Sequence, residues 1–137
     1  MAGEEYYGRG VDALFKGAPK IVAPFPRAGR RKDVTDYDPD IVGKAISEGS
    51  LQEIDPRTLS VSQPQVTLEG VRHYAEDRPG NFADGHKYGN EHPVVYQREG
   101  TNVLLSGTHR ATAALVKGKP LKGIVTQGPW GPPRRQA

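Results

Sequence analysis

The sequence has no cysteine among its 137 residues. That absence excludes disulfide bonds, thiolate metal sites and thiol catalysis. The chain also lacks any apolar run near the ~20 residues that a membrane-spanning helix needs. Its first ten residues, MAGEEYYGRG, have no apolar core, so we expect no signal peptide there. These absences together predict a soluble protein that does not enter a membrane.

Acidic residues are missing from the last part of the chain. No aspartate or glutamate follows Glu99, whereas six lysines and arginines do. A C-terminal third whose charge is almost entirely positive favours an anionic partner, such as a nucleotide, a nucleic acid or an acidic protein surface. A solvated basic face explains the same charges equally well, because the net charge of the whole chain is only +3.

Glycine and proline are concentrated in three parts of the chain. The sequence contains 17 glycines and 12 prolines, and they crowd the first third, residues 79–89 and the C-terminal end. A length of 137 residues corresponds to one ordinary domain. We therefore expect a compact core at residues 54–127. An N-terminal arm with one helix (1–53) and a basic Pro/Gly-rich tail (128–137) would lie on that core or on a partner.

Three helices are expected from hydrophobic spacing and capping residues. The first covers residues 39–48, with Asp38 as its cap, and the second covers residues 68–77, with Thr67 as its cap. The third, at residues 108–117, is alanine-rich and ends at a glycine. Extended segments are expected at 54–61, before the second helix, at 92–97 and 103–107, before the third, and at 121–127, after it. The order predicts an α+β fold with a small mixed sheet.

The stretch Ser106-Gly107-Thr108-His109-Arg110, here called the corner, lies where a strand is expected to become a helix. Free backbone N–H groups and the helix dipole favour an anion at such a point. Gly107 allows a ligand to approach the backbone closely, and the Thr108 hydroxyl can donate to a phosphate oxygen. Arg110 can bind a phosphate through two N–H groups, and His109 can polarise it or move a proton.

An ordinary strand-to-helix turn explains the same residues. In that interpretation Thr108 caps the helix, Gly107 forms the turn and Arg110 makes an exposed ion pair. Arg110 and Lys117 are one heptad apart, so both interpretations place them on the same helix face.

The segments EIDPRTLSVSQPQ, HPVVYQREGTNVLLSG, GTHRATAALVKGKP and LKGIVT, in this order, resemble the ParB/sulfiredoxin superfamily. The resemblance covers a little over half of the chain and implies a ParB/sulfiredoxin-like core. It also implies that Gly107, Thr108, His109 and Arg110 contact the phosphates of ATP or CTP with magnesium. Sulfiredoxins have their catalytic cysteine where this chain has Thr108, so sulfiredoxin activity is excluded. We find neither a second ParB nucleotide motif nor a helix-turn-helix.

Other polar residues are weaker candidates. Asp84, His86, Glu91 and His92 share one glycine-rich loop. It could bind a metal or act as acid and base if it folds over the corner, but a polar lid or a surface loop is the commoner case. The four histidines lack the spacing of a metal motif, so no metal site is expected. Glu69 suits a catalytic carboxylate and equally the N-terminal end of a helix dipole.

The sequence thus supports three hypotheses about function. The first is a nucleotide- or phosphate-binding protein that acts on phosphoryl groups if His109 and Glu69 are catalytic; whether it is an enzyme is left open. The second is a catalytically silent structural or adaptor protein, for example a bacteriophage virion or assembly component that makes contacts through its arms. The third is nonspecific DNA binding through the basic C-terminal third. Each is compatible with a location in the bacterial cytoplasm or in a virion.

Overall fold

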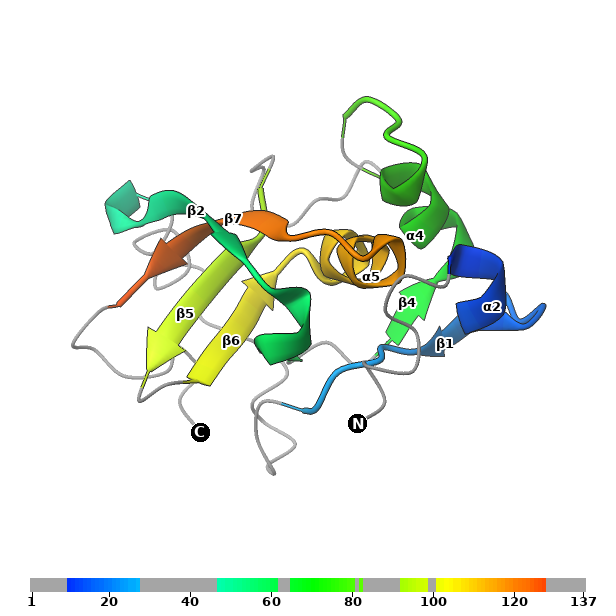
Figure 1. Cartoon of the computed structure of the whole chain (residues 1–137), viewed down its shortest axis with the longest axis horizontal. Helices are drawn as coiled ribbons and strands as arrows, with labels where there is room; N and C mark the ends of the chain where they lie inside the picture. Colours follow the sequence, from blue (N-terminus) through cyan, green and yellow to red (C-terminus); the bar gives the residue numbers. More distant parts are fainter. Residues whose placement is uncertain are drawn as a thin grey trace, which may run out of the picture.

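A computed structural model gives the fold of the chain and describes residues 10–27, 47–61, 65–80, 82, 92–98 and 101–127. The described helices and strands, shown in Figure 1, are α2 (Val11–Phe15), β1 (Lys20–Val22), β2 (Ser50–Ile54), the 3-10 turn η2 (Pro56–Thr58), β3 (Leu59–Val61), β4 (Gln65–Thr67), α4 (Leu68–Ala75), β5 (Val94–Arg98), β6 (Thr101–Ser106), α5 (Thr108–Lys117) and β7 (Leu121–Thr126). They confirm the predicted α+β class.

The larger sheet is mixed, with the strand order β2-β7-β5-β6-β3. Strand β2 is antiparallel to β7, and β5 is antiparallel to β6, whereas β5–β7 and β3–β6 are parallel. A second sheet contains only β1 and β4. The first three residues of the central strand β5 are buried, since Val94, Val95 and Tyr96 are each at most 1% exposed. This burial explains why the strand begins with an unbroken apolar run.

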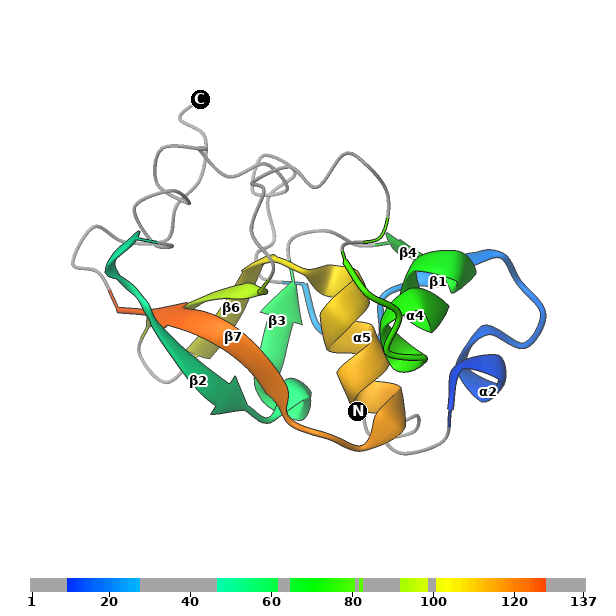
Figure 2. The same ribbon diagram turned by 90° about the horizontal axis from the view of Figure 1, so that it is seen from above.

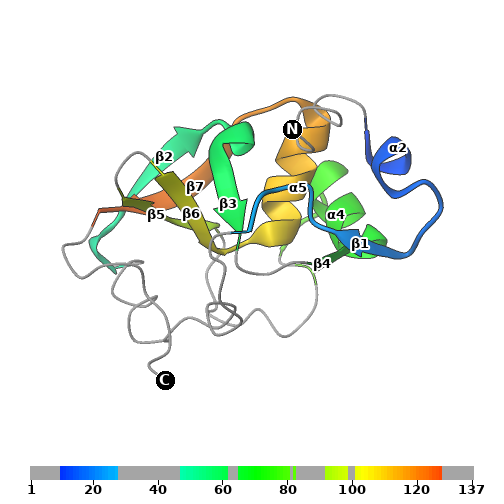
Figure 3. The ribbon, with the colours of Figure 1, turned by 90° about the horizontal axis from the view of Figure 1, so that it is seen from below.

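Helix α5 lies in the middle of the molecule. Figures 1 and 2 show it beside the five-stranded sheet, with α4 on its far side and α2 outermost, and Figure 3 shows the same order from below. Its residues Ala111, Thr112, Leu115 and Val116 are buried. Thr112 tolerates burial because its hydroxyl donates to the carbonyl of Thr108 at 2.8 Å. The alanine-rich sequence thus belongs to a helix that packs on two sides.

Part of the predicted N-terminal arm packs on the core of its own chain. Leu14 and Phe15 are buried at the end of α2, and β1 pairs with β4 through Lys20 opposite Thr67. The predicted boundary between residues 53 and 54 falls inside β2, which pairs with β7 along its whole length. Of the predicted helix at 39–48, the structure describes only Ser47 and Glu48, which are helical; the tail at 128–137 lies outside the described residues.

The bounds of α5 and the start of α4 agree with the sequence prediction, whereas the end of α4 and the cap of α5 do not. Helix α5 covers the predicted residues, and Thr67 caps α4 by accepting the Gly70 N–H at 3.2 Å. Helix α4 stops at Ala75, two residues before the predicted end, because the chain then turns into a left-handed conformation. The alternative that Thr108 caps α5 is wrong: Gly107 is the N-cap, and Thr108 is the first helical residue, only 4% exposed.

Candidate functional site

Gly107 at the corner is required by packing within the chain. Its φ angle is +100°, and a Cβ atom there would lie 2.8 Å from the Cβ and 2.9 Å from the Cα of Pro93. Pro93 is itself fixed, because its carbonyl accepts the Ile124 N–H at 2.8 Å. The close approach that a glycine permits is therefore used by Pro93, and no pattern in the sequence indicates this contact.

His109 connects the beginnings of α5 and α4. Its Nε2 accepts the backbone N–H of Thr67 at 3.1 Å, so the ring proton of the neutral imidazole lies on Nδ1. The ring lies over Gly70, and the ring of Phe82 is 5.6 Å away between centroids. Burial lowers the pKa of His109 from its ordinary value of 6.5. This residue holds two helix ends together in its uncharged form.

We expect acid to weaken the fold through His109. Because its folded-state pKa is lowered, the unfolded chain binds the proton more readily, and the contribution of His109 is fully present only above pH 6.5. The free energy of unfolding should decrease as the pH falls from 6.5 through the folded-state pKa. The His109→Gln variant, which keeps an uncharged acceptor, should lose this component of the pH dependence in urea titrations between pH 7.5 and 4.5. Identical profiles for the two proteins would contradict the assignment.

Arg110 points into a different environment from that of its neighbour His109. Its guanidinium carbon lies 4.2 Å from the centroid of the Tyr74 ring. The Tyr74 hydroxyl is held in turn, because it accepts the Phe82 N–H at 2.7 Å. Stacking on the aromatic ring restricts the orientation of the guanidinium.

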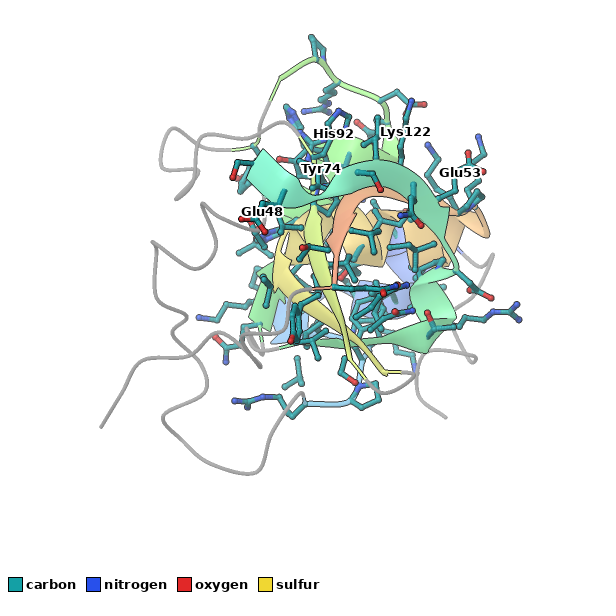
Figure 4. The ribbon with its side chains drawn as sticks, turned by 90° about the vertical axis from the view of Figure 1, so that its left-hand side faces the viewer. Glu48, Glu53, Tyr74, His92 and Lys122 are labelled. Carbon is teal, nitrogen blue, oxygen red and sulfur yellow. The ribbon has the colours of Figure 1, made fainter. Side chains whose placement is uncertain are left out.

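A cleft of about 450 Å³, here called the α5 cleft, lies beside Arg110. Its walls come from the end of α4, the face of α5 that carries Arg110 and Lys117, the start of β7 and the residues just before β5. Its lining residues are Tyr74, Asp77, Arg78, His92, Pro93, Arg110, Ala113, Ala114, Lys117, Lys119, Pro120, Leu121 and Lys122. Figure 4 shows three of them, His92, Tyr74 and Lys122, close together at the top of the view.

The charges of the α5 cleft are strongly unbalanced. The lining residues include five lysines and arginines but one carboxylate, so their formal charge without His92 is +4. Lys117 donates to both carboxylate oxygens of that one acid, Asp77, at 3.2 and 3.3 Å. Lys122 lies directly opposite Glu53 in the β2–β7 register. Such a wall raises the local concentration of anions.

The structure distributes the predicted site residues over different surroundings. Arg110 lines the cleft together with Lys117, which confirms that the two share a helix face, whereas Ser106, Gly107, Thr108 and His109 are not among the lining residues. Glu69 is exposed in the first turn of α4 and does not line it either. Of the four lid candidates only His92 is described, and it lines the cleft; Asp84, His86 and Glu91 lie outside the described residues.

Sequence reasoning missed three cationic residues of the cleft. Arg78 follows α4, while Lys119 and Lys122 belong to the turn and strand after α5. The loss of acidic residues after Glu99 was a signal for the two lysines. No comparable signal pointed to Arg78, which is brought to the cleft by the packing of α4 on α5.

Comparison of the chain with family models, curated proteins and solved structures found no match, so its resemblance to ParB/sulfiredoxin domains stays a prediction. Within the described part of the chain, no three His, Asp or Glu side chains are grouped so that they could hold a metal ion. None of the helices described above is long and apolar enough to cross a membrane.

Proposed function

We propose that this protein binds a phosphate-bearing small molecule of the nucleotide class in the α5 cleft. The observation that supports the proposal is the cleft itself, about 450 Å³ in volume and lined by five cationic side chains and one carboxylate. This volume is within the ~300–1,000 Å³ range of small-molecule sites. A net positive lining of this kind favours a ligand with several negative charges.

Arg110 is the residue we expect to contribute most to binding. Its stacking on Tyr74 restricts the guanidinium before any ligand arrives, so less side-chain freedom is lost on binding. A guanidinium binds a phosphate through two parallel N–H groups, whereas lysines act as point charges. Arg110 and Lys117 lie roughly 10 Å apart along the axis of α5. A chain of linked phosphates reaches both positions more easily than a single phosphate does.

The cleft also offers an apolar wall for the rest of a nucleotide. Ala113 and Ala114 on α5, with Pro120 and Leu121 after it, lie among the charged residues. A base or sugar could pack there while the phosphates contact the cations. ATP or CTP, with or without magnesium, are the first ligands to try, and the resemblance of the motifs to nucleotide-binding ParB domains favours the same class.

The proposal concerns binding and does not assign a reaction. The Nε2 atom of His109 already accepts the Thr67 N–H, and neither His109 nor Glu69 lines the α5 cleft. Proton transfer by either residue requires hydrogen-bond reach of the reacting group. The described contacts of His109 instead position the start of α5, from which Arg110 projects.

Calorimetric titration with ATP, ADP, CTP and GTP, each with and without magnesium, tests the proposal. We expect Arg110→Gln to weaken binding about 10- to 100-fold, the change that corresponds to a lost charged hydrogen bond. Arg72→Gln is the matched control, because Arg72 is also a helix arginine and pairs with Asp12 away from the cleft. Absence of binding at millimolar concentrations, or equal losses in both variants, would overturn the proposal. Binding of duplex DNA alone, weakened steeply by salt, would assign the cleft to nucleic acid instead.

A further inference from the structure

Asp77 has an unusual place at the end of α4. The Asp77 N–H donates to the Tyr74 carbonyl at 3.2 Å, and the Arg78 N–H donates to the His73 carbonyl at 3.0 Å. These two bonds form a Schellman motif, in which the residue in the position of Asp77 adopts a left-handed conformation. Its φ angle is +55°. Glycine or asparagine is the usual residue at such a position.

A carboxylate is unfavourable there for a second reason. The C-terminal end of a helix carries partial negative charge, which repels an acidic side chain. The compensating partner is Lys117 on α5, which donates to both Asp77 oxygens. The side chain of Asp77 is 82% exposed, whereas that of Lys117 is 23% exposed. The exposed carboxylate therefore covers a half-buried cation.

We propose that Asp77 acts as an internal counter-ion of the α5 cleft, which competes with the anionic ligand for Lys117 and so determines which anions are accepted. This inference rests on the proposed function and concerns the same cleft. Asp77 is the one carboxylate among its lining residues, and it contacts one of the five lining cations. A ligand that contacts Lys117 competes with Asp77 for the same ammonium group.

The competition acts on ligands that extend from Arg110 to Lys117 and leaves a single phosphate at Arg110 unaffected. A single phosphate at Arg110 does not reach Lys117, which lies roughly 10 Å further along α5. A chain of phosphates reaches it and replaces the carboxylate with a group of higher charge. Asp77 thus lowers the affinity for every ligand that extends to Lys117, and ligands of low charge displace it least well.

The test uses tripolyphosphate, which has the charge of a nucleotide but no base, and measures its binding by calorimetry. We expect Asp77→Asn to raise the affinity about two- to five-fold, which corresponds to removal of an exposed ion pair. Asparagine tolerates the left-handed conformation, so the end of α4 is preserved. Asp12→Asn is the matched control: Asp12 is similarly exposed, at 84%, and pairs with Arg72 outside the cleft. It should leave the affinity unchanged.

A double variant separates competition at Lys117 from a general effect of charge. In the Lys117→Gln background, Asp77→Asn should no longer raise the affinity, because the contested cation is gone. The inference is overturned if Asp77→Asn has no effect, if Asp12→Asn has the same effect, or if the gain persists without Lys117. Tripolyphosphate and nucleotides that bind none of these proteins would overturn the proposed function and this inference together. Tripolyphosphate binding without an effect of Asp77→Asn would overturn the inference alone.

Discussion

Replacement of Gly107 by alanine is expected to lower the free energy of unfolding by about 3–5 kcal/mol. Two costs add at this position. The backbone has a φ angle of +100°, which alanine adopts poorly, and the new Cβ atom would meet Pro93 at 2.8 and 2.9 Å. Pro93 cannot withdraw without losing the hydrogen bond from the Ile124 N–H. Urea denaturation followed by circular dichroism measures the loss.

Gly80→Ala is the matched control for the backbone component. Gly80 also has a positive φ angle, +79°, but a Cβ atom there would meet nothing within 4 Å. Its replacement should cost only about 1–2 kcal/mol of conformational strain. A loss at Gly107 no larger than that at Gly80 would contradict the role of Pro93. A Gly107→Ala protein of full stability that no longer binds phosphate would instead support the direct ligand contact expected from the sequence.

Local signals in the sequence predicted some elements well and others poorly. Helix α5 was predicted with correct bounds, because glycines stand at both of its ends and its apolar residues follow the helical period. Strand β2 was missed as a sheet member. Four of its five residues, Ser50–Glu53, are exposed, so no alternation of apolar and polar residues marks it. Only its pairing with β7 defines it as a strand, and pairing partners are not visible in a single segment.

In the candidate site, too, a spacing within one helix could be predicted from the sequence, whereas a contact between distant residues could not. A heptad spacing within one helix was enough to place Arg110 and Lys117 on a common face. The partner of His109 is Thr67, 42 residues away, and no spacing rule connects them. When only the sequence is considered, His109 has the chemistry of a residue that binds phosphate or acts as a general base. Residue type alone therefore predicted phosphate contact or proton transfer for His109 and could not reveal its contact with Thr67.

Replacement of Gly70 by alanine is expected to destabilise the protein by about 2–4 kcal/mol. In an exposed helix the same change would stabilise by roughly 1 kcal/mol, since alanine has the higher helix propensity. Here the new Cβ atom would lie 2.3 Å from Cδ2 and 2.8 Å from Nε2 of His109. The imidazole must move, and the Thr67 N–H then loses its acceptor.

The His109→Ala background tests this mechanism, because it removes the ring that the new methyl group would strike. Gly70→Ala should then become neutral or stabilise the protein by up to about 1 kcal/mol, so the two changes should be strongly non-additive. Urea midpoints of the wild type, both single variants and the double variant complete the cycle. Additive losses would mean that Gly70 is needed for some other reason. A Gly70→Ala protein as stable as the wild type would show that the imidazole can leave α4 without cost, and His109 would then be available for ligand contact.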